Sequence, residues 1–202
     1  TTEFIQECET RWSADFTQEA IPSFDQFSAD DLLHFMYGLF HSPTYRRRYA
    51  SELVIDFPRV LLPQGFGLFR ELARLGASLA ESHLMHLSRS DANPVRYVGD
   101  DEPIVAAGHP KFSQGRIYWN PHAYVESVDE TAWEFRVGSH QVLRKWLKDR
   151  RGRRLSRLAV NDYLAAIAAV RETLLTMSRI DQVIERFGGF AEAFEPSQDA
   201  TV

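Results

Sequence analysis

Cysteine is nearly absent from this 202-residue chain, in which Cys8 is the single example. An internal disulfide is therefore excluded, and the composition is typical of a reducing compartment, so we expect a cytoplasmic location. The chain also lacks any apolar run close to the roughly 20 residues that cross a bilayer. Its first residues, TTEFIQECETRW, have neither the basic start nor the apolar core of a signal peptide. The absence of an initial Met indicates a processed chain or a piece of a longer one.

Motifs that carry chemistry are missing as well. No G-x-S-x-G nucleophile motif, phosphate-binding P-loop or HExxH zinc motif is present. The histidine pairs at 34 and 41 and at 83 and 86 have no second cysteine to join them, so packing or surface roles are the better interpretation. Cys8 lies in a polar segment without an evident base, and the G-x-G at 65–67 lacks the third glycine of a dinucleotide site. The sequence therefore predicts neither a catalytic centre nor a metal site.

Charge is unevenly distributed along the chain. The net charge is −5, and residues 1–32 hold eight acidic side chains against a single arginine, Arg11. Positive charge is concentrated at 46–48 and at 144–157, where eight Lys or Arg accompany one acid, Asp149. Because phosphate contacts are made by a face of a protein and not by its average charge, this distribution favours an anionic partner, with nucleic acid as the first to test.

Helical spacing dominates both ends of the chain. Ser28 is a predicted N-cap, and the apolar stripe that follows continues to Phe40. Ser42 with Pro43 predicts the start of a second helix, and further helices are expected after Gly65 and from about 158 to 185. Residues 1–27 are interpreted as a polar lead-in and residues 188–202 as a flexible tail, which leaves 28–187 as the domain.

Between these helical regions the pattern changes to short strands. Runs of β-branched and aromatic residues (VRYV, PIVAA, RIYW, AYVESV and WEFRV) are separated by turn residues between 93 and 137. They predict a small, mostly antiparallel sheet over about 94–137. The expected fold class is α+β, a single domain in which this sheet packs with the N-terminal helices and a long C-terminal helix.

The stretch 133–157 combines a predicted core with a predicted interface. Alternation of Trp133, Phe135 and Val137 predicts a strand, and the apolar residues 142–147 predict an amphipathic helix. The basic run could be a solvated face, or it could contact the phosphates of nucleic acid. The candidate phosphate contacts are Arg144, Lys148, Arg150, Arg151, Arg153 and Arg154, with Arg46 and Arg47 of the earlier cluster.

Turns of the predicted sheet region supply candidate base-reading side chains. Amide, guanidinium and imidazole groups in turns can donate to base edges. The candidates are Gln114, Arg116, Asn120, His140 and Gln141. The aromatic side chains nearby fit a sheet core as well as they fit base-stacking platforms.

Long blocks of the sequence resemble a known family. FSADDLLHFMYGLFHSPTYRRRYA followed by LVIDFPRVLLP is similar to that family's "LHSPEYRERYA … DFPRIP" block, and GFGLFRELARLGASLAESHLM to its next helix. GRIYWNPHAYVESVDETAWEFRVGSHQVLRKWLKDRRGRRLS, with ETLLTMSRID after it, resembles the closing block. The family is the C-terminal specificity, or target recognition, domain of Type ISP restriction–modification enzymes and related adenine-specific DNA methyltransferases. The likeness covers about residues 28–182.

The resemblance implies a DNA-reading module that is not itself a catalyst. Its partners would be double-stranded DNA and an upstream methyltransferase domain, which carries the NPPY motif and binds S-adenosylmethionine. This sequence keeps only Asn and Pro of that motif, at 120–121. S-adenosylmethionine, and ATP with Mg²⁺, are therefore expected only in domains outside this chain. The alternative is a protein-interaction or scaffold domain whose basic run docks onto an acidic partner or a neighbouring domain.

Overall fold

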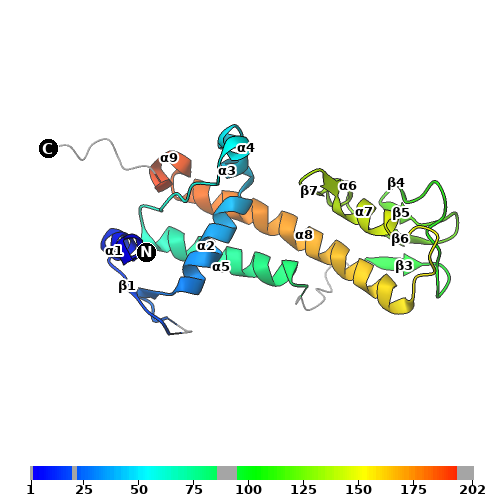
Figure 1. The fold of residues 1–202 in the computed structure, drawn as a ribbon, viewed down its shortest axis with the longest axis horizontal. Coiled ribbons are helices and arrows are strands. Elements are labelled where there is room, and N and C mark those ends of the chain that lie inside the picture. The colour runs from blue at the N-terminus through cyan, green and yellow to red at the C-terminus, as the bar shows by residue number, and fades with distance from the viewer. Residues whose placement is uncertain (1, 20–21, 86–94, 195–202) are drawn as a thin grey trace. The chain divides into compact units, whose positions relative to one another are not determined.

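The computed structural model describes residues 2–19, 22–85 and 95–194. Its contacts divide the chain into two compact units, which we call unit 1 (residues 1–81 and 175–202) and unit 2 (residues 82–174) (Figure 1). Both units contain helices and short strands, and the strand pairs of unit 2 are antiparallel, so the α+β class is confirmed. Within the described residues, none of the helices combines the length and the apolar character needed to cross a bilayer.

Unit 1 is predominantly helical. Its short strands β1 and β2 pair in parallel, and long helices carry most of its buried residues. The predicted helices after Ser28, Ser42 and Gly65 are confirmed. The elements are α1 (Thr2–Trp12), β1 (Asp15–Phe16), β2 (Gln26–Phe27), α2 (Ala29–His41), α3 (Pro43–Arg48), α4 (Glu52–Ile55), α5 (Phe66–His83), residues 175–186 of α8 (Arg157–Arg186) and α9 (Gly189–Phe194).

Local capping explains where two of these helices begin. The Ser28 hydroxyl accepts a hydrogen bond from the Asp31 amide, and the Asp31 carboxylate accepts one from the Ser28 amide, which makes a reciprocal capping box. Ser42 likewise accepts from the Tyr45 amide at 3.0 Å. The Ser42 hydroxyl also donates to Asp181 of α8, so the start of α3 is fixed to that helix. Both predicted caps are confirmed.

Two glycines let α2 and α5 approach closely. A β-carbon at Gly76 would lie 1.8 Å from the carbonyl oxygen of His34, and one at Gly38 would lie 2.7 Å from that of Leu72. Side chains at these positions would therefore collide with backbone atoms of the facing helix. The contact brings Phe35 and Leu72 into one core, in which both are fully buried.

The segment predicted as a polar lead-in contributes to the core. Cys8 and Trp12 of α1 are buried, and the Trp12 indole donates to the carbonyl oxygen of Pro63 at 2.9 Å. The Trp12 ring also stacks on Phe69, with centroids 4.2 Å apart. At the other end, α9 buries Phe190, so the folded chain continues past the predicted start of the tail at 188. Residues 195–202 of that tail lie outside the described residues.

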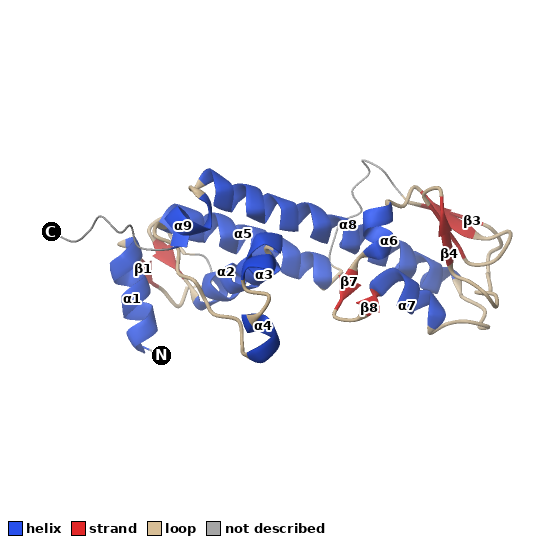
Figure 2. Ribbon diagram, turned by 90° about the horizontal axis from the view of Figure 1, so that it is seen from above, coloured by secondary structure: helices blue, strands red, loops and turns tan. Residues whose placement is uncertain are grey.

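Unit 2 is organised around an antiparallel sheet in the strand order β3-β6-β5-β4, called here the main sheet. Figure 2 shows this sheet and the β7–β8 pair as separate red elements. The elements of unit 2 are β3 (Arg96–Val98), β4 (Lys111–Ser113), β5 (Arg116–Tyr118), β6 (Tyr124–Glu126), α6 (Glu130–Glu134), β7 (Arg136–Val137), β8 (His140–Gln141), α7 (Val142–Lys148) and residues 157–174 of α8.

One face of the main sheet forms the core of unit 2. Ile117 and Val125 are fully buried, and they join Trp119, Leu143 of α7 and Tyr163 of α8 in one apolar cluster. The Trp119 ring meets Tyr163 edge-on at 5.3 Å between centroids. The opposite face of the sheet is therefore the face that is available to a partner.

The prediction of a strand over 133–137 is wrong. Trp133 lies in helix α6, where its amide donates to the carbonyl oxygen of Asp129, and its ring stacks on Phe112 of β4. The strand is limited to Arg136–Val137. Alternation of three apolar residues suggested a strand, but the contact with Phe112 is tertiary and leaves no local pattern. The predicted run at 103–107 also forms no strand and contributes a single bridge, between Ile104 and Arg154.

Candidate nucleic-acid interface

The basic run forms a fixed loop between α7 and α8, residues 149–156, called here the basic loop. Its Gly152 amide donates to the carbonyl oxygen of Val105 at 3.0 Å, and its Leu155 amide donates to that of Pro103 at 2.9 Å. Gly152 has φ +76°, a left-handed conformation that suits glycine and allows the chain to turn. The 103–105 segment therefore holds the loop in one conformation.

Two of the predicted phosphate contacts bond to the protein itself. The Arg150 guanidinium lies 3.7 Å from the Trp146 ring centroid and donates to the Trp146 carbonyl oxygen at 3.1 Å. Arg151 donates from Nε and Nη2 to the carbonyl oxygen of His109, at 3.2 and 2.6 Å. These two arginines add positive charge to the surface, but Arg150 also joins the basic loop to α7, and Arg151 joins it to the backbone at His109.

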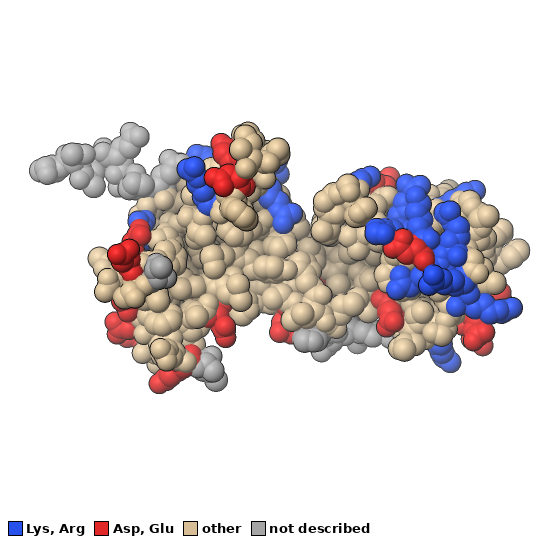
Figure 3. All heavy atoms as spheres, in the orientation of Figure 1, with Lys and Arg blue, Asp and Glu red and all other residues tan. Residues whose placement is uncertain are grey.

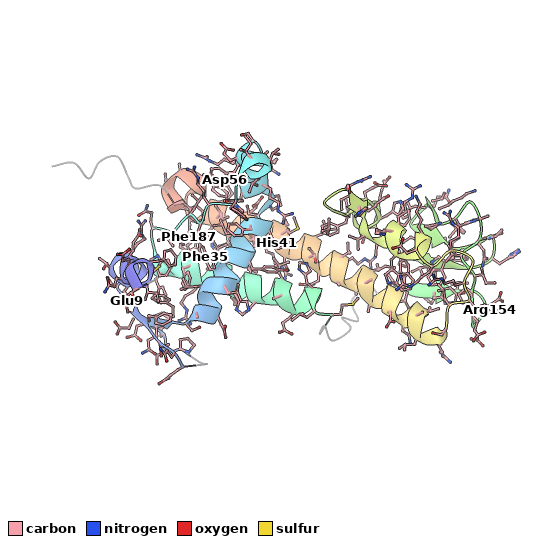
Figure 4. The ribbon with its side chains drawn as sticks, in the orientation of Figure 1. Glu9, Phe35, His41, Asp56, Arg154 and Phe187 are labelled. Carbon is pink, nitrogen blue, oxygen red and sulfur yellow. The ribbon has the colours of Figure 1, made fainter. Side chains whose placement is uncertain are left out.

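The other predicted cations of the run are exposed. Arg144, Lys148, Arg153 and Arg154 have no hydrogen bond or ion pair to another described side chain. Blue side chains gather over the part of unit 2 that contains α7 (Figure 3), and Arg154 is labelled on the basic loop in Figure 4. These four side chains are the ones that can turn toward an anionic ligand.

The one acid of the run is neutralised locally. Lys145 donates to the Asp149 carboxylate at 2.7 Å, across one turn of helix. This hydrogen bond, followed by the nearby positive charges, lowers the pKa of Asp149 below its ordinary value. The carboxylate therefore cancels Lys145 and leaves the charge of the exposed arginines intact.

The β4–β5 hairpin of the main sheet carries Gln114 in its turn and Arg116 at the start of β5. Gln114 is exposed at the turn, with φ +50°, and Gly115 follows with φ +72°. The Arg116 guanidinium lies 4.8 Å from the Tyr124 ring centroid. A hydrogen bond with the Tyr118 side chain, helped by Tyr124, raises the pKa of Arg116 above its ordinary value. Arg116 is therefore a fixed positive charge on the face of the main sheet opposite the buried Ile117 and Val125, called here the outer face.

Asn120 and Gln141 have structural partners. The side-chain Oδ1 of Asn120 accepts hydrogen bonds from the backbone amides of His122 and Ala123, both at 2.8 Å, and its Nδ2 donates to the carbonyl oxygen of Ile104. Gln141 is buried, and its Nε2 donates to the carbonyl oxygen of Trp133 at 2.9 Å. Both amides hold the fold, and a base reader needs a free amide. His140, by contrast, is exposed on β8.

Arg46 and Arg47 belong to α3 of unit 1, whereas the basic loop belongs to unit 2. Arg46 donates from Nε to the carbonyl oxygen of Phe40 at 2.6 Å, and partial burial lowers the pKa of its guanidinium from the ordinary value. Arg47 donates from Nη2 to the Thr44 hydroxyl at 2.7 Å. Both side chains thus have partners within α2 and α3.

A metal-dependent site has no support in the described part of the chain. No group of three or more His, Cys, Asp or Glu side chains there is arranged to hold a metal ion.

Comparison with models of protein families assigns the chain to a family. The model of the Type ISP C-terminal specificity domain matches residues 3–179. The chain belongs to this family. The specificity domain is a recognition module of a larger enzyme, and its match begins well before residue 28, in agreement with the buried residues of α1. A search of curated proteins finds no match.

Three solved structures, of two Type ISP restriction–modification enzymes and of a DrdV–DNA complex, share the fold of this specificity domain. It matches the ATP-dependent Type ISP enzyme LlaBIII bound to DNA with a TM-score of 0.59 and 19% identity over 76% of this chain. It matches a nuclease-deletion mutant of the Type ISP enzyme LlaGI with a DNA substrate mimic (TM-score 0.54, 21% identity, 80% of this chain) and a DrdV–DNA complex (0.57, 19%, 89%). The chain spans 11%, 14% and 19% of those chains, respectively.

Two outer-face residues of unit 2, Arg96 and Glu126, were missed by sequence reasoning. Arg96 and Arg116 both approach Glu126, and Tyr124 lies under the Arg116 guanidinium. Alternation within each strand predicts which side chains share a face, but the strand order that makes β6 the neighbour of both β3 and β5 has no local signal.

Proposed function

We propose that this specificity domain reads double-stranded DNA as the non-catalytic target-recognition module of a larger restriction–modification enzyme. The observation that carries the proposal is the set of exposed cations on α7 and on the basic loop, whose backbone is held by the 103–105 segment. Support comes from the family and from the fold shared with LlaBIII, LlaGI and DrdV, whose structures contain DNA or a DNA mimic.

The proposed roles of the side chains follow from their partners. Arg144, Lys148, Arg153 and Arg154 contact phosphates, which positions the domain without selecting a sequence. Arg150 and Arg151 contribute charge while they hold the loop. Gln114, Arg116 and His140 remain the proposed base readers, because their side chains are exposed or partly exposed.

Chemistry is assigned to other parts of the parent enzyme. We place S-adenosylmethionine, and ATP with Mg²⁺, in an upstream methyltransferase domain and its companions, because this sequence contains no NPPY or P-loop motif. Methylation or cleavage would then require that domain, and purified specificity domain would bind duplex without altering it.

The test is a duplex-binding titration at several salt concentrations. Fluorescence anisotropy with a labelled duplex should give a log–log salt slope. Arg153→Glu with Arg154→Glu should weaken binding by on the order of tenfold at low salt, and should reduce the slope by about 0.9 for each phosphate that the variant no longer neutralises. A control that makes the same charge change on exposed arginines of unit 1, Arg59→Glu with Arg74→Glu, should weaken binding much less. Equal effects of the two double variants would remove the basic loop from the interface.

A second function, docking onto protein, is favoured by a different surface. In the described part of unit 1, α4 has no fully buried residue, and Val54, Ile55 and nearby Phe57 are 86%, 87% and 88% exposed. We propose that this apolar tip contacts a neighbouring domain of the parent enzyme, with the upstream methyltransferase domain as the expected partner. Val54→Ser with Phe57→Ser should weaken co-purification of that domain and leave duplex binding unchanged.

A further inference from the structure

The outer face of the main sheet carries a row of charged side chains that runs across β5, β6 and β3. The register pairs Ile117 with Val125 and Arg96 with Glu126. Arg116 and Glu126 therefore lie next to each other on neighbouring strands, on the face opposite the buried Ile117 and Val125. The order along the row is Arg116, Glu126, Arg96.

Glu126 interacts with both arginines. Its Oε1 accepts hydrogen bonds from Nε and Nη2 of Arg96, at 2.9 and 2.6 Å, while its Oε2 lies 3.6 Å from Nη2 of Arg116. The Glu126 side chain is 20% exposed, against 72% for Arg96 and 44% for Arg116. The carboxylate is therefore the covered partner of two more exposed guanidinium groups.

The orientation of these guanidinium groups is restrained. Arg96 bonds through one edge, which leaves its Nη1 group without a partner among the described residues. Arg116 lies over the Tyr124 ring and uses part of its five-donor guanidinium group for the hydrogen bond with Tyr118, while its Nη2 contact with Glu126, at 3.6 Å, is longer than a hydrogen bond. Both arginines therefore keep N–H donors for a ligand, and their neighbours on the sheet restrain the planes of the two guanidinium groups.

This arrangement suits base edges better than phosphates. A phosphate can also accept two hydrogen bonds from a guanidinium group, but it carries a full negative charge, and the negative charge of Glu126 would weaken its attraction to the two arginines. A guanine edge presents O6 and N7 as paired acceptors in the major groove, and it requires an oriented guanidinium fork. The groove also has room for a β-ribbon.

We propose that Arg96 and Arg116, held in orientation by Glu126, read guanine bases in the major groove of duplex DNA. The inference rests on the proposed function and adds to it the class of base that is recognised. Glu126 is a positioning residue, and Arg96 joins the set of base readers. The basic loop supplies phosphate contacts, so affinity and base preference depend on different residues of unit 2.

Selection from a library of duplexes with a randomised centre tests the inference on the full chain. Wild-type protein should enrich duplexes with guanine at fixed positions. Arg116→Lys and Arg96→Lys keep the charge but lack the fork, and each should reduce the preference for guanine at one position by about tenfold to a hundredfold. Affinity for an unrelated duplex should change by no more than about twofold, because the phosphate contacts are retained.

The positioning role of Glu126 has its own readout. Glu126→Gln should reduce guanine preference at both positions without reducing affinity for an unrelated duplex, and Glu126→Asp should restore part of it. Lys111→Gln, on the edge strand β4 of the same sheet, is the matched control and should leave base preference unchanged. A thermal melt of each variant separates loss of side-chain orientation from loss of fold. If Glu126→Gln fails to fold, the guanine preference of Arg96→Lys, a change at an exposed residue, tests the inference instead.

The results separate the two proposals. Wild-type protein that binds no duplex at low salt would remove the DNA-binding function and this inference with it. Wild-type protein that binds without enriching guanine, or lysine variants that keep the wild-type preference, would overturn the guanine inference alone and leave DNA binding in place.

Discussion

The Arg150 guanidinium lies over the Trp146 ring at 3.7 Å and donates to the carbonyl oxygen of the same residue. Trp146 in turn packs against Tyr163, with ring centroids 4.9 Å apart. The arginine thus covers an aromatic contact between α7 and α8. A side chain that the sequence marks as a phosphate contact is therefore also part of the support for the basic loop.

Arg150→Ala should destabilise unit 2, whereas Arg153→Ala should not. Removal of the stacked guanidinium and its hydrogen bond should lower the free energy of unfolding by about 1–2 kcal/mol. Arg153 is exposed and should change it by less than about 0.5 kcal/mol. Urea unfolding followed by circular dichroism measures both values. Similar destabilisation by the two variants would contradict a structural role that is specific to Arg150.

Asn120→Ala should destabilise the β5–β6 turn. The side chain makes three hydrogen bonds to backbone groups, and their removal should cost about 1–2 kcal/mol. Asn120→Asp keeps an acceptor for the amides of His122 and Ala123 and should cost less. In the duplex selection, Asn120→Asp should keep the wild-type base preference. A changed preference in that stable variant would restore Asn120 as a base reader.

Gly76→Ala should be among the most damaging single changes in unit 1. The added carbon would meet the His34 backbone at 1.8 Å, and a cost of about 3 kcal/mol or more is expected because backbone atoms cannot move aside independently. Gly67→Ala, in the same helix, meets only the Phe187 ring at an ordinary 3.7 Å. That control should stabilise the protein by up to about 1 kcal/mol, since alanine favours helix. Melting temperatures should therefore shift in opposite directions.

Cys8 should be unreactive in the folded protein. Burial, followed by the charge of Glu7, raises the pKa of the thiol from 9.0 to about 11. At pH 8 the native thiolate fraction should then be about a hundredfold lower than in unfolded chain, and burial slows access further. Reaction with a chromogenic disulfide, with and without urea, measures the ratio. Rapid labelling of native protein would show that α1 does not shield the thiol.

The same pKa shift predicts a loss of stability in alkali. Unfolded protein releases the Cys8 proton near pH 9.0, while folded protein holds it to about pH 11. Because the unfolded state binds fewer protons in this window, its free energy falls relative to the folded state, and stability decreases by up to about 3 kcal/mol as pH rises from 9 to 11. Cys8→Ala should show a shallower decline. Parallel curves for the two proteins would exclude this contribution.

Local sequence signals predict much of the scaffold. Ser28 and Ser42 are recognisable as caps because capping depends on residues three positions away. The helix over 142–148 follows from its apolar spacing, and the end of α8 at Arg186 follows from the two glycines after it.

The exposure and the partners of the candidate side chains could be known only from the tertiary structure. Arg150 and Arg153 are indistinguishable in a basic run, yet one stacks on Trp146 and the other is exposed. Gln141 has a side-chain amide of the kind that reads bases, but its partner is the carbonyl oxygen of Trp133, in a helix that the sequence indicated as a strand. Glu126 became significant through its neighbours on two other strands, and strand order is not encoded in any single strand.

Helix α8 has a practical consequence for engineering this domain. Unit 2 is an insertion within unit 1, and its C-terminal limit at Leu174 falls inside an uninterrupted helix of 30 residues. A chimera that exchanges unit 2 for that of a relative must therefore join two helices in phase, because one residue added or removed would rotate the following side chains by about 100°. If the proposed base readers of unit 2 act as inferred, grafts that preserve this phase should transfer target specificity between family members.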